Sequence, residues 1–93
     1  MAYEIKWTPL AKDNYFETVS YIYDNWGEIS AEKFTDDLEA SLKNLERFHF
    51  IGKPYALLPS VRELVLGKHQ SLFYTVFENT ILILNLIDSR RKV

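Results

Sequence analysis

Two stretches of helical periodicity that meet at Gly27 constrain the fold of this chain more than any other feature. Thr8 and Pro9 suit an N-cap and a first helical position, which predicts a helix that runs to about Trp26. Gly27 suits a left-handed residue that ends this helix. Ser30 can then cap a second helix of about sixteen residues.

Each predicted helix has one apolar stripe with spacings of three and four residues, which we expect to be buried. The first stripe consists of Leu10, Ala11, Tyr15, Val19, Ile22 and Trp26. The second consists of Ala31, Phe34, Leu38, Leu42 and Leu45. Because the link between the helices is short, they should form an antiparallel hairpin that needs a sheet beneath it.

Four segments have the alternation or the β-branched and aromatic content of strands. They are Tyr3–Trp7, Val61–Leu66, Ser71–Glu78 and Thr80–Ile87, with a tight turn at Asn79-Thr80 and a connecting loop over residues 47–60. The order β-α-α-β-β-β predicts an α+β fold, with a helix hairpin packed on a four-stranded antiparallel sheet. At 93 residues, we expect one domain over residues 1–93.

Composition excludes several kinds of chemistry. The chain has no cysteine, which rules out disulfides, a thiolate nucleophile and a cysteine zinc site. The two histidines, His49 and His69, are far apart and lack metal-ligand spacing, so we expect no metal and no cofactor. We see neither a signal peptide nor an apolar run of the ~20 residues that span a membrane, and therefore expect a cytoplasmic protein without a membrane partner.

Charge is unevenly distributed along the chain. Residues 1–46 carry four basic and ten acidic side chains, a balance of −6, whereas residues 47–93 carry seven basic and three acidic ones, a balance of +4. This asymmetry suggests two faces with different partners. It is equally compatible with solvated acidic helices beside a sheet end that happens to carry arginine.

The ordered set of segments resembles the RelE/ParE toxin superfamily over nearly the whole chain. The opening strand runs into W-T-P-L-A, and Phe34, Leu38, Leu42 and Leu45 give the F-x-x-x-L-x-x-x-L-x-x-L pattern of the second helix. The more diagnostic part follows, with V-R-E-L-V-L-G-K over residues 61–68, S-L-F-Y-T-V over 71–76 and I-L-I-L-N-L-I-D-S-R-R over 81–91.

The resemblance implies a cytoplasmic toxin that is neutralised by a cognate antitoxin, with which it would form a hetero-oligomer. ParE-like members inhibit DNA gyrase, and RelE-like members cut messenger RNA on the ribosome. A third alternative is a non-toxic interaction module that kept the fold and lost the activity. Fold alone does not choose among these, so the site must decide.

Metal-free RNA cleavage needs a base, an acid and cations around the phosphate. The catalytic candidates for a nuclease are Arg62, His69, Tyr74 and Arg90, and the candidates for binding a target or antitoxin are Arg62, Lys68, Arg90 and Arg91. Each also has a structural interpretation. Arg62 could pair with Glu63 or Asp37, Tyr74 could pack in the core, and a turn histidine such as His69 is commonly plain surface.

The chain departs from RelE-like nucleases in its charge. Those proteins are strongly basic, since binding to ribosomal RNA depends on phosphate neutralisation, whereas this chain has net charge −2 and a pI near 5.6. The predicted second helix is acidic, no tyrosine follows Arg91, and we expect Asp88 to repel a phosphate at the adjacent arginines. These features favour a ParE-like protein that acts without being an enzyme, with a metal-independent endoribonuclease as the alternative.

Overall fold

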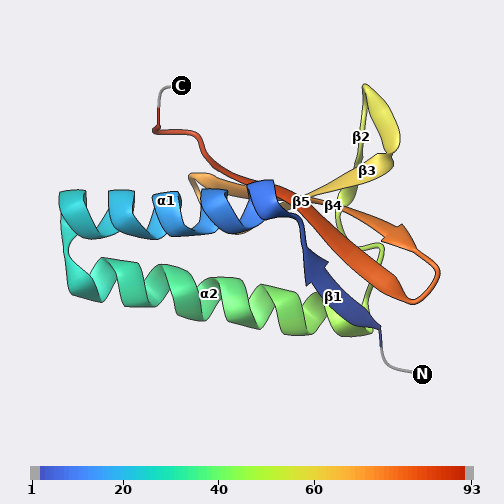
Figure 1. The fold of residues 1–93 in the computed structure, drawn as a ribbon, viewed down its shortest axis with the longest axis horizontal. Coiled ribbons are helices and arrows are strands. Elements are labelled where there is room, and N and C mark those ends of the chain that lie inside the picture. Colours follow the sequence, from blue (N-terminus) through green and yellow to red (C-terminus); the bar gives the residue numbers. More distant parts are fainter. Residues whose placement is uncertain (1–2, 92–93) are drawn as a thin grey trace.

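The computed structural model describes residues 3–91, which form two helices and a five-stranded sheet (Figure 1). The elements in chain order are β1 (Glu4–Trp7), α1 (Pro9–Trp26), α2 (Glu28–Arg47), β2 (Lys53–Tyr55), β3 (Leu58–Val65), β4 (Gln70–Phe77) and β5 (Thr80–Asp88). The predicted α+β class is confirmed, as is the order of one strand, two helices and a run of strands. Both helices lie side by side, and the sheet extends beyond one end of the pair.

The sheet has the strand order β1-β5-β4-β3-β2, and the predicted four-stranded antiparallel sheet is wrong in two respects. The first is the direction of β1, which is parallel to β5. Its pairing is flanked by backbone hydrogen bonds from Glu4 N to Asn79 O at 2.8 Å and from Thr8 N to Ile83 O at 3.0 Å. A helix hairpin follows β1 in place of a tight turn, and such a long crossover permits a parallel neighbour.

The second difference is β2, which lies inside the predicted loop of residues 47–60 and pairs with β3. Pro54 lacks an N–H group and disguises this strand in the sequence, yet proline is tolerated at a sheet edge. β3 also begins at Leu58, ahead of the predicted Val61. Together, β2 and the adjoining part of β3 project away from the helix pair (Figure 1).

A single residue, Gly27, joins the two helices. Its N–H donates to Tyr23 O at 2.8 Å and its carbonyl accepts from Ala31 N at 3.2 Å, so α2 begins at Glu28. The predicted cap at Ser30 is therefore wrong, because Gly27 already closes one helix and opens the next. Gly27 has a positive φ of 91°, but its ψ of −176° is extended and not left-handed helical.

The core lies between the helix hairpin and one face of the sheet. The predicted stripe of α2 is confirmed, with Leu42 half-buried and the other four residues buried. The stripe of α1 is only partly right, since Leu10 and Trp26 are 56% and 48% exposed while Thr18 is fully buried. The strands contribute Leu72, Tyr74, Ile81, Ile83 and Leu86.

A bulge in β5 decides which way the end of that strand faces. Tyr74 pairs with Ile83 while Phe73 pairs with Asn85, which leaves Leu84 without a partner in β4. An extra residue reverses the inside–outside alternation of a strand. Consequently Ile83 is buried before the bulge and Leu86 after it.

Two side chains near the start of α1 bind the backbone around this bulge. Thr8 Oγ1 donates to Leu84 O at 3.0 Å, and Asn14 Oδ1 accepts from Leu86 N at 3.2 Å. The bulge therefore turns Asp88, two residues beyond Leu86, toward the helix side of the sheet, where it is buried.

Candidate functional site

The structure separates the predicted site residues into two groups. Arg62 and Tyr74 are paired in the middle of β3 and β4. Lys68 and His69 lie in the turn between these strands, beside Arg90 at the end of β5. Three residues of β3 separate Arg62 from the turn, which begins at Leu66, and this span corresponds to about 13 Å. The structure thus brings Lys68, His69 and Arg90 together and leaves Arg62 and Tyr74 apart from them.

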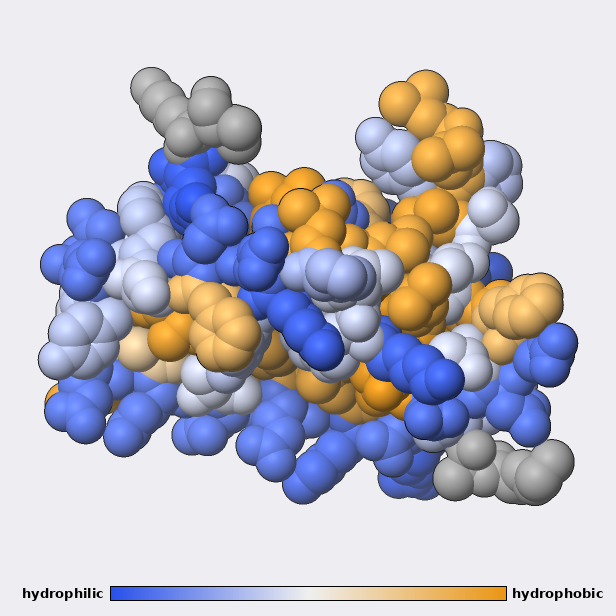
Figure 2. Space-filling view, viewed as in Figure 1, coloured by the Kyte–Doolittle hydropathy of each residue, from blue (hydrophilic) through white to orange (hydrophobic). Residues whose placement is uncertain are grey.

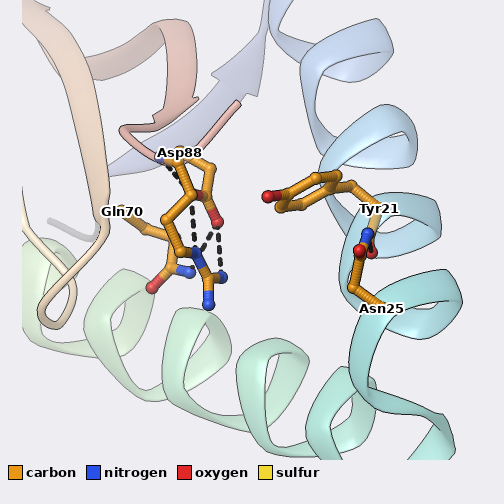
Figure 3. Close-up of polar contacts among 5 residues, drawn as sticks. Tyr21, Asn25, Gln70 and Asp88 are labelled. Atoms are coloured by element: carbon orange, nitrogen blue, oxygen red, sulfur yellow. Dashed lines mark hydrogen bonds and ion pairs between the residues drawn. The ribbon is translucent and has the colours of Figure 1, made fainter. Parts of the chain in front are cut away.

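Arg90 is held by Asp88 in a bidentate ion pair. Nε donates to Asp88 Oδ1 at 3.1 Å and Nη2 donates to Oδ2 at 2.8 Å. The carboxylate also accepts from Arg90 N at 2.9 Å and from Gln70 Nε2 at 2.9 Å, which fixes its orientation. Figure 3 shows Gln70 beside Asp88, with the Tyr21 ring of α1 directed toward them.

An aromatic pair on α1 completes the setting of Arg90. The guanidinium carbon lies 4.0 Å from the centroid of the Trp26 ring and 5.8 Å from that of Tyr21. The two rings meet edge to face at 5.6 Å. Asn25 Nδ2 donates to Tyr21 O at 2.8 Å within the same helix (Figure 3). The Asp88 carboxylate thus binds the edge of the Arg90 guanidinium, and the Trp26 ring packs against its face.

The electrostatics of Asp88 differ from the sequence-based expectation. Burial alone would raise the pKa of Asp88, but hydrogen bonds from Arg90 and Gln70 outweigh burial and leave that pKa below its ordinary value of 3.8. The hydrogen bonds to Asp88 in turn raise the pKa of Arg90. Because the Asp88 side chain is fully buried and paired, it orients Arg90 and does not present a repelling charge to solvent.

Arg90, Lys68 and His69 line a cleft of about 370 Å³ between the β3–β4 turn and the joined ends of the helices. Its apolar wall consists of Ile22, Trp26, Phe34 and Leu66. On its α2 side, Lys33 Nζ lies 2.9 Å from Asp37 Oδ2, and this hydrogen bond raises the pKa of Lys33. We call this feature the β3–β4 cleft.

Arg91 lies outside the β3–β4 cleft. Its Nη2 donates to Glu17 Oε2 at 3.2 Å, and its guanidinium carbon lies 6.0 Å from the Tyr21 ring centroid. It lines a separate, open groove with Phe16, Glu17, Ser20, Tyr21 and Asp24. The next residues, Lys92 and Val93, which belong to the predicted basic terminus, lie outside the described part of the chain.

Arg62 and Tyr74 both fasten the loop that follows α2. Arg62 Nη1 donates to Phe50 O at 3.1 Å and to Gly52 O at 2.7 Å, and Tyr74 Oη accepts from Gly52 N at 2.9 Å. Burial raises the pKa of Tyr74, an effect reduced by the Gly52 hydrogen bond and the Arg62 charge. Arg62 thus binds backbone oxygens and not Glu63 or Asp37, the acids that its structural interpretation offered. A catalytic role for the fully buried Tyr74 stays a prediction that requires this loop to open.

Sequence reasoning missed two contributors to the cleft, Trp26 and Gln70. Trp26 has the spacing of the buried stripe of α1, and only the packing of Arg90 on its ring shows another role. Gln70 carries no sequence signal beyond its position next to His69. Within residues 3–91, no three His, Asp or Glu side chains gather in a way that could hold a metal ion.

A second, apolar groove of about 450 Å³ lies between the helices. It is lined by Trp7, Lys12, Tyr15, Phe16, Thr35, Leu38, Glu39 and Leu42. Phe16 is 65% exposed at its edge. Figure 2 shows hydrophobic side chains between the helices on this face, bordered by a hydrophilic row. In the part of the chain that the structure describes, no helix is long and apolar enough to cross a membrane.

A helix hairpin on a sheet of this order is the architecture of the RelE/ParE toxin superfamily. A family model described as the ParE toxin of the type II toxin–antitoxin system parDE matches residues 5–93. The chain therefore belongs to the ParE toxin family of type II toxin–antitoxin systems. No curated protein gives a significant match.

Solved structures agree with this assignment. The chain is similar to the chromosomal ParDE system from P. aeruginosa, with 25% identity and a TM-score of 0.78 over 92% of this chain and 95% of that chain. The YoeB dimer from Staphylococcus aureus gives 25% identity and 0.62 over 91% and 94%. The toxin–antitoxin complex RelBE2 from Mycobacterium tuberculosis gives 17% identity and 0.68 over 95% and 99%, which shows the shared fold alone.

Proposed function

We propose that this chain is a cytoplasmic toxin that acts by binding DNA gyrase or a related topology enzyme and is neutralised by a cognate antitoxin. The observation that carries the proposal is the engagement of its arginines. Arg62 binds backbone oxygens, Arg90 binds Asp88 and Arg91 binds Glu17. A metal-free nuclease needs several cations gathered around one phosphate, and these three arginines are held at separate places by their own partners, which favours a protein-binding toxin.

The antitoxin is proposed to cover apolar surface and to bring acidic side chains to the basic half of the chain. The groove between the helices offers exposed aromatic surface for an amphipathic segment. A partly disordered antitoxin that folds on the toxin would pay its ordering entropy on binding and so needs such a surface. The same contacts define a toxin–antitoxin hetero-oligomer.

One observation supports the endoribonuclease as a second candidate. Lys68, His69 and Arg90 meet in the β3–β4 cleft, and a histidine with two cations is a set that could act on a phosphate. Arg62 and Tyr74 lie about 13 Å along the strand from the turn, so the catalytic role predicted for them stays a prediction that this cleft does not include.

The deciding experiment combines two assays on purified chain freed of antitoxin. We expect it to inhibit supercoiling by gyrase, with inhibition reversed by antitoxin, and to leave messenger RNA intact in a translating extract. Codon-phased cuts in the mapped 5′ ends, lost in His69→Gln and Arg90→Gln but kept in Arg91→Gln, would make the nuclease primary. A chain that neither inhibits gyrase, cuts RNA nor slows growth when expressed alone would be a non-toxic interaction module.

A further inference from the structure

The guanidinium of Arg90 is fixed in place, but not all of its N–H donors have an acceptor. It carries five N–H donors, of which the Asp88 carboxylate takes two, one on Nε and one on Nη2. Among residues 3–91, Nη1 has no hydrogen-bond acceptor, and Nη2 keeps a second hydrogen. The edge formed by Nη1 and Nη2 is therefore open to a further acceptor. Arg90 is 26% exposed as a side chain, so this acceptor can come from solvent.

The geometry of that edge selects a planar oxyanion. Two parallel N–H groups of an arginine match the two oxygens of a carboxylate. Asp88 and the Trp26 ring hold the guanidinium in one plane before any ligand arrives, which lowers the entropy lost on binding. A polar network around Arg90 that served the fold alone would not require Arg90 to line a cleft.

Charge in the β3–β4 cleft limits the ligand to a single anionic group. Arg90 is neutralised by Asp88, and Lys33 is neutralised by Asp37. Lys68 is then the main uncompensated cation among the cleft residues. One carboxylate matches this balance, whereas a string of phosphates would place further negative charge beside Asp37, which also lines the cleft.

Part of the lining of this cleft is apolar. Trp26 is half exposed, and Ile22, Phe34 and Leu66 line the cleft beside it. A ligand that fills the 370 Å³ should therefore place an apolar group beside its anion. An acidic residue next to an aliphatic residue in a polypeptide has this composition.

We propose that the β3–β4 cleft binds one carboxylate side chain of a partner polypeptide, flanked by an apolar residue, with the outer edge of Arg90 as its recognition group. The partner is the antitoxin, and only this choice of partner rests on the proposed function. Asp88 and Gln70 are positioning residues that orient Arg90, and Lys68 supplies charge at the rim. The site itself can be tested without the antitoxin.

The test is an NMR titration of the labelled full chain with the peptide Ac-Leu-Glu-Leu-NH2. We expect saturable shifts at the Arg90 Nε–H, the Trp26 indole N–H and the Gln70 side-chain amide. The neutral peptide Ac-Leu-Gln-Leu-NH2 should bind about 10-fold more weakly, since it cannot form the charge-assisted pair. Equal binding of the two peptides, or shifts that are absent or spread over the surface, would overturn the proposal.

Three variants distinguish bidentate recognition by the Arg90 guanidinium from attraction by its positive charge alone. Arg90→Lys keeps the positive charge but loses the parallel N–H donors of the guanidinium, and should lower the affinity for the Glu peptide about 10-fold. The matched Arg91→Lys should leave this affinity unchanged. If Arg90→Lys fails to fold, Lys68→Gln leaves Arg90 and Asp88 intact and should weaken binding about 3-fold. Loss of affinity in Arg91→Lys as large as in Arg90→Lys would contradict the assignment.

Two further probes identify a different occupant. Inorganic phosphate or adenosine monophosphate that binds the cleft more tightly than the Glu peptide would assign it to a nucleotide and overturn the polypeptide proposal. Gyrase inhibition and growth arrest report separately on the proposed function. A chain that poisons cells but ignores the Glu peptide would refute this site alone, and a chain that binds the peptide without toxicity would refute the proposed function alone.

Discussion

Arg62 and Arg90 each lie over an aromatic ring and each donate to two oxygens, but the oxygens differ. Arg62 lies 5.0 Å from the Phe50 ring centroid and donates to the backbone oxygens of Phe50 and Gly52. Arg90 lies 4.0 Å from the Trp26 ring centroid and donates to the carboxylate of Asp88. One arginine is held by uncharged backbone and the other by a buried charge.

This difference gives the two arginines different roles, one in holding the backbone and one in binding. Both acceptors of Arg62 belong to one loop, so its hydrogen bonds fix the path of the chain between α2 and β2. The acceptor of Arg90 is two residues away and fixes only Arg90 itself, through its guanidinium and its backbone N–H, at the lining of the β3–β4 cleft. Damage around Arg62 should therefore appear first in folding stability, and damage around Arg90 first in binding.

The largest loss of folding stability should come from Gly52→Ala, in the loop that Arg62 holds. A Cβ at this buried position would lie 2.9 Å from Glu63 O and from Cε1 and Oη of Tyr74. Such overpacking in a rigid site should lower the free energy of unfolding by about 3 kcal/mol, measured by urea denaturation. Gly67→Ala is the matched control, because its Cβ would meet only Gln70 Oε1 at 3.6 Å and should change stability by less than about 1 kcal/mol. Equal stability of both variants would mean that the Gly52 loop is not anchored.

A smaller effect, at the other arginine, should depend on pH. Asp88→Asn removes a buried carboxylate that accepts charged hydrogen bonds, and we expect a loss of about 2 kcal/mol of unfolding free energy at neutral pH. Since the Asp88 pKa lies below its ordinary value, the carboxylate stabilises the fold above that value and loses this effect as the pH falls through the lowered pKa. Urea unfolding at several pH values should therefore show wild type and variant converging below about pH 4. A gap that persists or widens in acid would contradict the ionised pair.

The helices could be predicted from the sequence because their signals are local. Thr8 and Pro9 set the start of α1, Gly27 ends it, and the apolar spacing of α2 identified its buried face. The short strand β2 could not be predicted, because Pro54 removes the donor that strand patterns assume and only the edge position makes this harmless.

The candidate site was predictable only in part, and the bulge at Leu84 explains why. Resemblance to a toxin family pointed to Arg90, Lys68 and His69, which do meet in one cleft. The burial of the Asp88 side chain depends on a register shift in β5. Thr8 and Asn14, more than seventy residues earlier in the chain, hold this shift through hydrogen bonds. The sequence shows only that Asp88 stands next to the arginines, which suggested a repelling charge where the structure has a buried partner.

The smallest effect should come from Thr18 of α1, which forms no hydrogen bond with either arginine. Its side chain is fully buried, and its Oγ1 has no hydrogen-bond partner among the described residues. An unpaired buried hydroxyl opposes folding, because it loses its hydrogen bonds to water and gains none. Thr18→Val keeps the branched shape without the hydroxyl and should raise the free energy of unfolding by about 1 kcal/mol. Thr18→Ser, which keeps the hydroxyl and loses the methyl, should lower it by about 1 kcal/mol through a small cavity. Urea denaturation should give free energies of unfolding that decrease in the order valine variant, wild type, serine variant. A valine variant less stable than wild type would mean that the Thr18 hydroxyl has a hydrogen-bond partner in solution.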